Sequence, residues 1–268
     1  MLRTRILTAL VLAPSVLAAI YYLPALGYGV LFLLITAAAC IEWGQLCGLG
    51  DPARPFLSLL PYLLGYLCFG AAVLLVPELQ RSVMGAALLL WVLLGWRVLR
   101  FDPEQARARV YRADALAGYL IIGAAFAALL QLRSTGGAPL VFLALLIVWL
   151  ADIGAYFAGR ALGRRKLAPR VSPGKTWEGA IGGMVLATAA ISGILWYTSA
   201  FDLRWLPLLL LVVCVSIVGD LFESTLKRRA GVKDSGRLLP GHGGLLDRID
   251  ALLPALPLLA MVLGLVGQ

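Results

Sequence analysis

Long apolar runs alternate with short polar connections along the whole chain. A run of about twenty apolar residues is long enough for a helix to cross a bilayer. We predict nine such helices, at residues 6–23, 28–46, 57–76, 82–99, 113–132, 139–158, 180–199, 205–222 and 251–267. The pattern therefore predicts an all-α polytopic membrane protein that forms a single membrane domain over residues 1–268.

The first run leaves two interpretations open. The basic start MLRTR before an apolar run is also typical of a secretory signal. The run is rather long for a signal, which favours a retained spanning helix. A removed signal would leave eight spans.

Composition supports a bilayer as the main solvent. Hydrophobic residues make up 61% of the chain and charged residues only 14%, whereas soluble domains are about a quarter charged. No polar connection could hold a separate soluble domain, because even one βαβ unit needs about thirty residues. A nucleotide or sugar site must therefore be built from the ends of membrane helices.

Basic residues fall mainly on one side of the predicted membrane. With the N-terminus in the cytoplasm, twenty of the 23 Lys and Arg residues lie on the cytoplasmic side, and only Arg81, Arg133 and Arg204 lie opposite. Cytoplasmic loops carry such an excess, so the C-terminus is predicted outside. The net charge of +9 is thus a topology signal. Without a continuous basic arm or interleaved aromatics, we predict no nucleic-acid partner.

Acidic residues inside one predicted span and near the ends of two others are candidates for a site. Asp152 lies well inside the sixth span, where an ionisable group is costly and usually functional. If the eighth helix continues past its apolar run, Asp220, Glu223, Ser224 and Lys227 share one face. Asp247 starts the ninth span, and Asp250 follows three residues later. A structural hydrogen bond for Asp152 and interfacial positions for the others remain alternatives.

These acids suggest a metal. Mg²⁺ binds a few carboxylates together with phosphates and water, and Asp220 and Asp247 could supply ligands from opposite sides of residues 224–250. Neighbouring cations such as Lys227, Arg228 and Lys233 would bind anionic oxygens. Acids for metal combined with cations for phosphate are the usual arrangement of phosphoryl-transfer sites.

Two glycine-containing segments are candidates for phosphate binding. In SPGKTWEG, residues 172–179, Ser172 is predicted as a helix N-cap with Pro173 as the first helical residue. Free N–H groups there, together with Lys175, could bind a phosphate. The segment is not a P-loop, because Pro169 occupies the position of the required glycine. His242 lies between glycines and could contact a ligand. An ordinary capped helix and a simple loop histidine are the alternatives.

Two polar features nearer the N-terminus are assigned less specific roles. Glu42 and Trp43 are predicted as interfacial anchors of the second span. Basic residues between Arg97 and Arg112 are predicted to form a solvated patch that faces lipid headgroups.

Residues 224–250 resemble the signature of the phosphatidate cytidylyltransferase family. The matching positions are Ser224, Lys227, Arg228, Lys233, Asp234, Pro240, His242, Gly243, Gly244, Asp247, Arg248 and Asp250. SPGKTWEG and ADIGAYFAGR are similar to two further motifs of that family. The motifs cover about residues 149–250, and the hydropathy is similar over the whole chain.

The resemblance implies an enzyme that joins CTP and phosphatidate into CDP-diacylglycerol and releases pyrophosphate. It implies Mg²⁺, with room for a second cation, and a homodimer in the bacterial inner membrane, with the C-terminus in the periplasm and the site facing the cytoplasm. Residues 1–135 would form a scaffold with lipid and dimer contacts, and residues 136–268 would carry catalysis.

Residue roles follow from the resemblance and the reasoning above. Asp220 and Asp247 are predicted metal ligands, and Asp152 and Lys227 are predicted to act with them in catalysis. The predicted substrate-binding residues are Ser172, Lys175, Thr176, Arg228, Lys233, Asp234, His242 and Arg248.

Two other classes fit less well. A secondary transporter would show broken helices in paired repeats, and no clear internal repeat is found. A CDP-alcohol phosphotransferase would carry an Asp-rich DG…AR…G…D…D pattern, which is missing.

Overall fold

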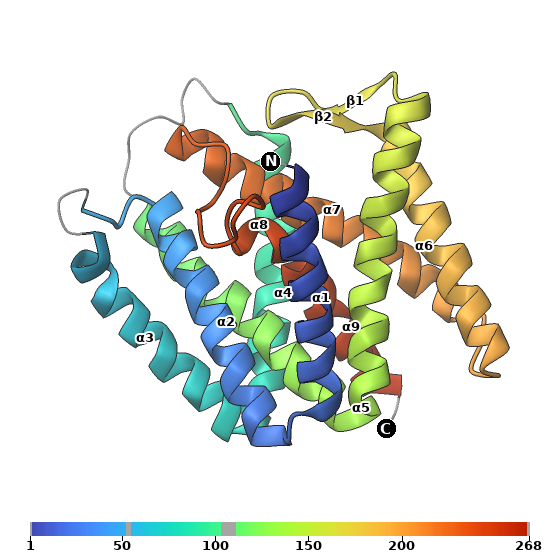
Figure 1. Ribbon diagram of the computed structural model, residues 1–268, viewed down its shortest axis with the longest axis horizontal. Helices are drawn as coiled ribbons and strands as arrows, with labels where there is room; N and C mark the ends of the chain where they lie inside the picture. Colours follow the sequence, from blue (N-terminus) through green and yellow to red (C-terminus); the bar gives the residue numbers. More distant parts are fainter. Residues whose placement is uncertain (1, 52–54, 103–110, 267–268) are drawn as a thin grey trace.

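The computed structural model describes residues 2–51, 55–102 and 111–266. They form helices packed side by side, with a short hairpin at one end of the bundle (Figure 1). The elements are α1 Leu2–Tyr22, α2 Ala25–Leu46, α3 Pro55–Leu75, α4 Pro77–Leu99, α5 Arg112–Leu162, β1 Lys166–Ala168, β2 Ser172–Thr176, α6 Trp177–Tyr197, α7 Trp205–Ala230, α8 Leu246–Ile249 and α9 Leu252–Val266.

Seven helical segments in the described part of the chain are long and apolar enough to cross a membrane, and the apolar part of α1, Leu10–Tyr22, is shorter. Large apolar side chains, such as those of Leu89 and Tyr197, point outward. Such exposure is costly in water but natural in lipid. The prediction of an all-α polytopic membrane protein is confirmed at this level.

Helix α5 contains two of the predicted spans, 113–132 and 139–158. Gly137 interrupts it with φ 67° and ψ −161°, a conformation outside the helical region, which glycine adopts without steric cost. Pro139 follows two residues later and lacks the N–H that a helix interior needs. The two halves therefore form separate rods (Figure 1).

Helix α7 extends past the predicted end at residue 222 to Ala230. Its last turn carries Lys227, Arg228 and Arg229, which interact favourably with the negative end of the helix dipole. Gly231, at φ 70°, ends the helix in the left-handed conformation. The shared face of Asp220, Glu223 and Lys227 is thereby confirmed as helical.

The predicted helix start at Ser172 is wrong. Ser172–Thr176 is strand β2, which pairs antiparallel with β1, with Lys166 opposite Thr176 and Ala168 opposite Ser172. Helix α6 begins at Trp177, and the hydroxyl oxygen of Thr176 accepts a hydrogen bond from the Gly179 N–H at 3.1 Å. Thr176, rather than Ser172, is therefore the N-cap.

Small residues bring α6 against the second half of α5. A Cβ on Gly154 would lie only 2.8 Å from the Gly182 carbonyl oxygen, and one on Gly183 would overlap the Ala151 carbonyl. Close approach through small residues is typical of packing between membrane helices. The β1–β2 hairpin, which connects the two helices, therefore lines the same cavity as Asp152.

Candidate functional site

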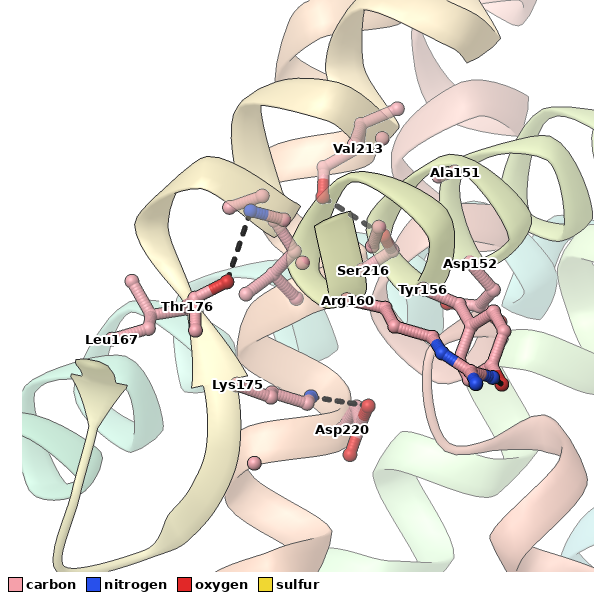
Figure 2. Close-up of a pocket in the computed structure, with 17 residues that line it drawn as sticks. Ala151, Asp152, Tyr156, Arg160, Leu167, Lys175, Thr176, Val213, Ser216 and Asp220 are labelled. Atoms are coloured by element: carbon pink, nitrogen blue, oxygen red, sulfur yellow. Dashed lines mark hydrogen bonds and ion pairs between the residues drawn. The ribbon is translucent and has the colours of Figure 1, made fainter. Parts of the chain in front are cut away.

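A cavity of about 400 Å³ lies beside the hairpin, between α5, α6 and α7. Four residues predicted from the sequence line it: Asp152, Lys175, Thr176 and Asp220. Figure 2 shows Lys175 from β2 reaching toward Asp220 of α7, and the two side chains form an ion pair. The structure thus brings SPGKTWEG and ADIGAYFAGR, two separate sequence motifs, to one cavity.

Asp152 lines this cavity from α5 and is solvent-accessible in the isolated chain. Two residues that the sequence reasoning did not select lie one and two turns further along α5. They are Tyr156 and Arg160, and Arg160 Nη1 donates a hydrogen bond to Tyr156 Oη at 2.9 Å. Arg160 belongs to the motif ADIGAYFAGR, and membership of that motif is the sequence feature that could have identified it as a residue of the site.

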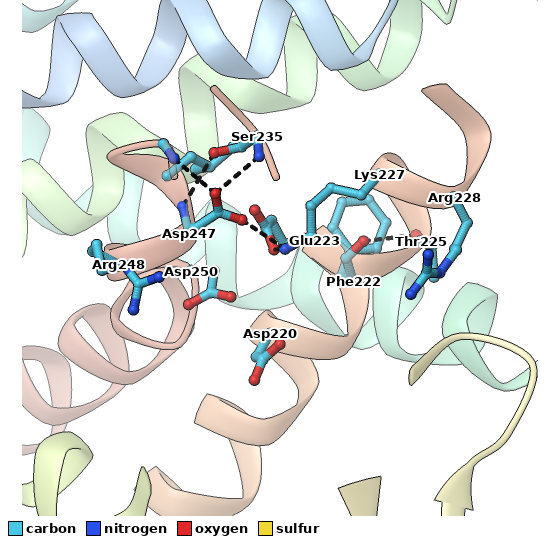
Figure 3. Close-up of polar contacts among 12 residues, drawn as sticks. Asp220, Phe222, Glu223, Thr225, Lys227, Arg228, Ser235, Asp247, Arg248 and Asp250 are labelled. Carbon is cyan, nitrogen blue, oxygen red and sulfur yellow. Dashed lines mark hydrogen bonds and ion pairs between the residues drawn. The ribbon is translucent and has the colours of Figure 1, made fainter. Parts of the chain in front are cut away.

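Three carboxylates gather next to the cavity. Ligand oxygens of Asp220, Glu223 and Asp250 all lie within 4.8 Å of one another, and Figure 3 shows them converging from α7 and the end of α8. Glu223 is 1% exposed, and neither of its carboxylate oxygens has a hydrogen-bond partner among the described residues. Its carboxylate forms an ion pair with the ammonium of Lys227.

This cluster fits a small divalent cation. Buried carboxylates without hydrogen bonds are costly unless a cation compensates them, and Mg²⁺ takes oxygen ligands at about 2.0–2.1 Å. Asp220 also borders the cavity, so an ion in the cluster could contact a phosphate there. Glu223 and Asp250 are therefore candidate ligands beside the predicted ligand Asp220.

Asp247, the other predicted ligand, has a different environment. Its Oδ1 accepts a hydrogen bond from Lys227 Nζ at 2.7 Å, and its Oδ2 accepts from the Ser235 and Gly244 N–H groups at 2.9 Å each. Lys227 lies between Asp247 and Glu223 and pairs with both. Asp247 therefore borders the carboxylate cluster through Lys227, and its oxygens are occupied by protein donors (Figure 3).

The remaining predicted binding residues lie around this centre. Arg228 Nε donates to the Val171 carbonyl at 3.2 Å, which ties α7 to the hairpin. Arg248 donates through Nη2 to the His242 carbonyl at 2.6 Å. Lys233 and Asp234 line a separate groove of about 1100 Å³ beside the end of α2. Those two are therefore not brought to the cavity next to the hairpin.

Glu42 is not an interfacial anchor as predicted. It is buried at 6% exposure and accepts hydrogen bonds from the segment that leads into α8. Its neighbour Trp43 is also buried, and its indole donates to the Asp114 carbonyl at 2.8 Å. The sequence argument that selected Asp152, an acid inside an apolar run, would also have selected Glu42.

Arg97 keeps 41% of its side chain exposed, as the predicted solvated patch requires, but it also pairs with a buried acid. Its guanidinium forms two hydrogen bonds with the carboxylate of Asp114, at 2.6 and 3.0 Å, and Arg229 pairs with the same carboxylate. Asp114 is 3% exposed, so this group ties the start of α5 to the ends of α4 and α7. The other basic residues of the predicted patch between 103 and 110 lie outside the described residues.

Taken together, the fold and the cavity define a polytopic membrane protein with a site suited to a metal ion and an anionic ligand. Comparison with known proteins identifies the family. The chain belongs to the cytidylyltransferase family, whose sequence model matches residues 3–266.

Curated relatives match over nearly the whole length. Phosphatidate cytidylyltransferases of Pseudomonas aeruginosa and Brucella suis are each 40% identical to this chain, covering 100% and 96% of it and 98% and 92% of their own lengths. The protein of the same name from Haemophilus influenzae is 34% identical, covering 96% of both chains. The family resemblance found in the sequence motifs is confirmed.

Proposed function

We propose that this protein is a phosphatidate cytidylyltransferase, which makes CDP-diacylglycerol from CTP and phosphatidate for bacterial phospholipid synthesis. Full-length similarity to enzymes of that name carries the proposal. The cavity beside the hairpin supports it, because Lys175 and the nearby acids suit a metal-bound polyphosphate.

In the proposed reaction, a phosphate oxygen of phosphatidate attacks the α-phosphorus of CTP. A new P–O bond forms, and the bond from the α-phosphorus to the bridging oxygen breaks, so that pyrophosphate leaves with both bonding electrons. The second pKa of a phosphate monoester is about 6, so the nucleophile is already ionised near pH 7. A general base is therefore not required, and the main barrier is repulsion between two anions.

The chain's own residues lower that repulsion. Lys175, half-buried at the cavity wall, neutralises phosphate charge when it exchanges its pair with Asp220 for the substrate. Mg²⁺ would be held by Asp220 with Glu223 and Asp250, and it would neutralise phosphate oxygens and orient them for in-line displacement. Asp247 remains a proposed ligand that requires Lys227 to move.

We further propose nine spans, with the N-terminus in the cytoplasm and the C-terminus in the periplasm. The twenty-to-three distribution of Lys and Arg supports this arrangement. It puts the hairpin and the α7–α8 connection on the cytoplasmic side of the inner membrane, where soluble CTP meets a lipid substrate. The homodimer expected from the resemblance stays a prediction, checked by the mass of the purified protein in detergent.

The test uses the purified chain in detergent with phosphatidate, labelled CTP and Mg²⁺. Labelled CDP-diacylglycerol is expected, and chelation of Mg²⁺ with EDTA should abolish it until the metal is restored. Omitting phosphatidate is the control. Absence of product under conditions in which the Pseudomonas aeruginosa relative is active would overturn the proposal.

A further inference from the structure

Glu42 lies on α2, far in sequence from the motifs of the site, yet it contacts the segment that carries Asp247. Its carboxylate accepts hydrogen bonds from Ser235 Oγ at 3.0 Å, from the Leu245 N–H at 3.1 Å and from the Leu246 N–H at 2.8 Å. Leu246 is the first residue of α8. The carboxylate therefore holds both ends of the 235–246 segment at once.

The same segment holds Asp247. The backbone N–H groups of Ser235 and Gly244 donate to Asp247 Oδ2, and Ser235 Oγ accepts from the Asp247 N–H at 3.3 Å. Ser235 thus contacts Glu42 through its hydroxyl and Asp247 through both its hydroxyl and its backbone. A shift of Glu42 would be transmitted to the carboxylate that pairs with Lys227.

Two glycines allow this close approach. A Cβ on Gly236 would overlap Glu42 Oε1, and a Cβ on Gly244 would overlap Ser235 Oγ. The backbone of the segment is therefore packed directly against the Glu42 carboxylate. A larger side chain at either position would have to displace the Glu42 carboxylate or the segment itself.

The contacts require an acceptor with two oxygens. All three partners of Glu42 are donors in this arrangement, and an ionised carboxylate only accepts. A glutamine of the same shape would offer one acceptor oxygen and turn an NH₂ group toward an N–H or hydroxyl donor. None of the ion pairs in the described part of the chain includes Glu42, so these neutral donors are its stabilising contacts.

We propose that Glu42 is a positioning residue for the cytidylyl transfer: it fixes the 235–246 segment so that Asp247 and Lys227 keep their places beside the acid cluster. This inference rests on the proposed function. It assigns the first half of the chain a direct part in organising the site, through a residue that contacts neither cavity nor cluster.

The experiment compares Glu42→Gln and Glu42→Asp with the unaltered protein and with Glu78→Gln. Glu78 is an exposed glutamate in the first turn of α4, so the control makes the same chemical change away from the segment. For Glu42→Gln, kcat should fall about 10–100-fold, as for other outer-shell partners of a site. The KM for CTP should change less than about threefold, because the cavity residues are untouched. Glu42→Asp keeps the charge and should retain more activity.

Hydrogen exchange provides a readout that does not depend on turnover. The amides of Leu245 and Leu246 donate to Glu42, so peptides covering residues 243–250 should exchange faster in Glu42→Gln and remain unchanged in Glu78→Gln. If Glu42→Gln does not fold, Ser235→Ala removes one bond to the carboxylate. It should change kcat and exchange in the same direction by a smaller amount.

Either of two results would overturn the inference: a kcat for the folded Glu42→Gln or Ser235→Ala variant equal to that of the unaltered protein, or a lost kcat with unchanged exchange over residues 243–250. A lack of activity in the unaltered protein would instead overturn the proposed function. The exchange comparison would then still decide whether Glu42 fixes the segment.

Discussion

The cavity beside the hairpin and the connection between α7 and α8 border the same acids, but they are built in different ways. In the cavity, Asp152 and Lys175 line open space, and Lys175 has one ion-pair partner, Asp220. Next to the connection, the carboxylate of Asp247 on α8 is occupied by Lys227 and two backbone N–H groups. On the proposed function, we expect the cavity to bind the substrate and the connection to hold the surrounding residues in place.

This contrast matters because the long signature lies in the connection. A residue can belong to a signature because it contacts substrate or because it holds the residues that do. On the proposed function, Asp220 and Lys175 are expected to belong to the first group, because they line the cavity. Asp247 is expected to belong to the second group, because protein donors occupy its oxygens.

The largest effect is expected from Asp220→Asn. Removing one charge from the acid cluster should lower activity by about 10²–10³-fold, as the loss of one electrostatic group in an active site does, and should raise the Mg²⁺ concentration needed for half-maximal rate. Asp202→Asn is the matched control. Hydrogen bonds from Arg204 hold the pKa of Asp202 at about 2, so Asp202→Asn removes a carboxylate charge away from the cluster at neutral pH. Equal activity of the two variants would remove Asp220 from the site.

Asp247→Asn should act on both activity and stability. Asn keeps the shape but loses the charge that Lys227 pairs with, so the free energy of unfolding should fall by about 1.5–3 kcal/mol. Activity should fall about 10–100-fold. Thermal unfolding followed by circular dichroism in detergent measures the first quantity. A large loss of activity with unchanged stability and a shifted Mg²⁺ requirement would instead make Asp247 a metal ligand.

Lys175→Ala should mainly weaken nucleotide binding. Lys175 is a cation of the cavity wall, so its loss should raise the KM for CTP about tenfold, or about 1.4 kcal/mol. Little change in thermal stability is expected, because its ion pair is partly exposed. Lys166→Ala, at an exposed position on β1, is the control. A fall in kcat at constant KM would show that Lys175 stabilises the transition state and does not contribute to ground-state binding of CTP.

Thr176→Ala should give the smallest effect. The hydroxyl caps α6 through Gly179, and losing such a cap costs about 1 kcal/mol. Thr176→Ser keeps the hydroxyl and should restore stability. Activity of both variants should stay within about threefold of the unaltered protein if Thr176 only caps the helix. A larger loss in Thr176→Ala, with stability restored in Thr176→Ser but activity not, would make the methyl group part of the cavity.

Hydropathy predicted the helices closely, because the requirement for apolar residues in lipid acts on every position of a span. The end of α7 at Ala230 was harder to predict, since its last turns are basic and no longer apolar. The hairpin was also missed: β1 and β2 have three and five residues, and Pro173 and Gly174 indicate a helix start or a turn more readily than a strand.

For the site, spacing along one helix correctly predicted which residues share a face. The sequence did not predict which residues distant along the chain are in contact. The shared face of Asp220, Glu223 and Lys227 follows from helical periodicity. The contact of Glu42 with Leu246 joins residues 204 positions apart, and its partners are backbone groups, which every residue carries. No local pattern can indicate such a partner. The sequence feature that could have drawn attention to Glu42 is a carboxylate inside an apolar run, because burying such a group is costly.

The first helix also has a partner at the opposite end of the chain. Thr8 Oγ1 donates to the Pro240 carbonyl at 2.9 Å, across 232 positions, just before His242. This hydroxyl links the first helix to the tip of the α7–α8 connection. A fusion partner that tilts the first helix would therefore strain the loop that precedes His242.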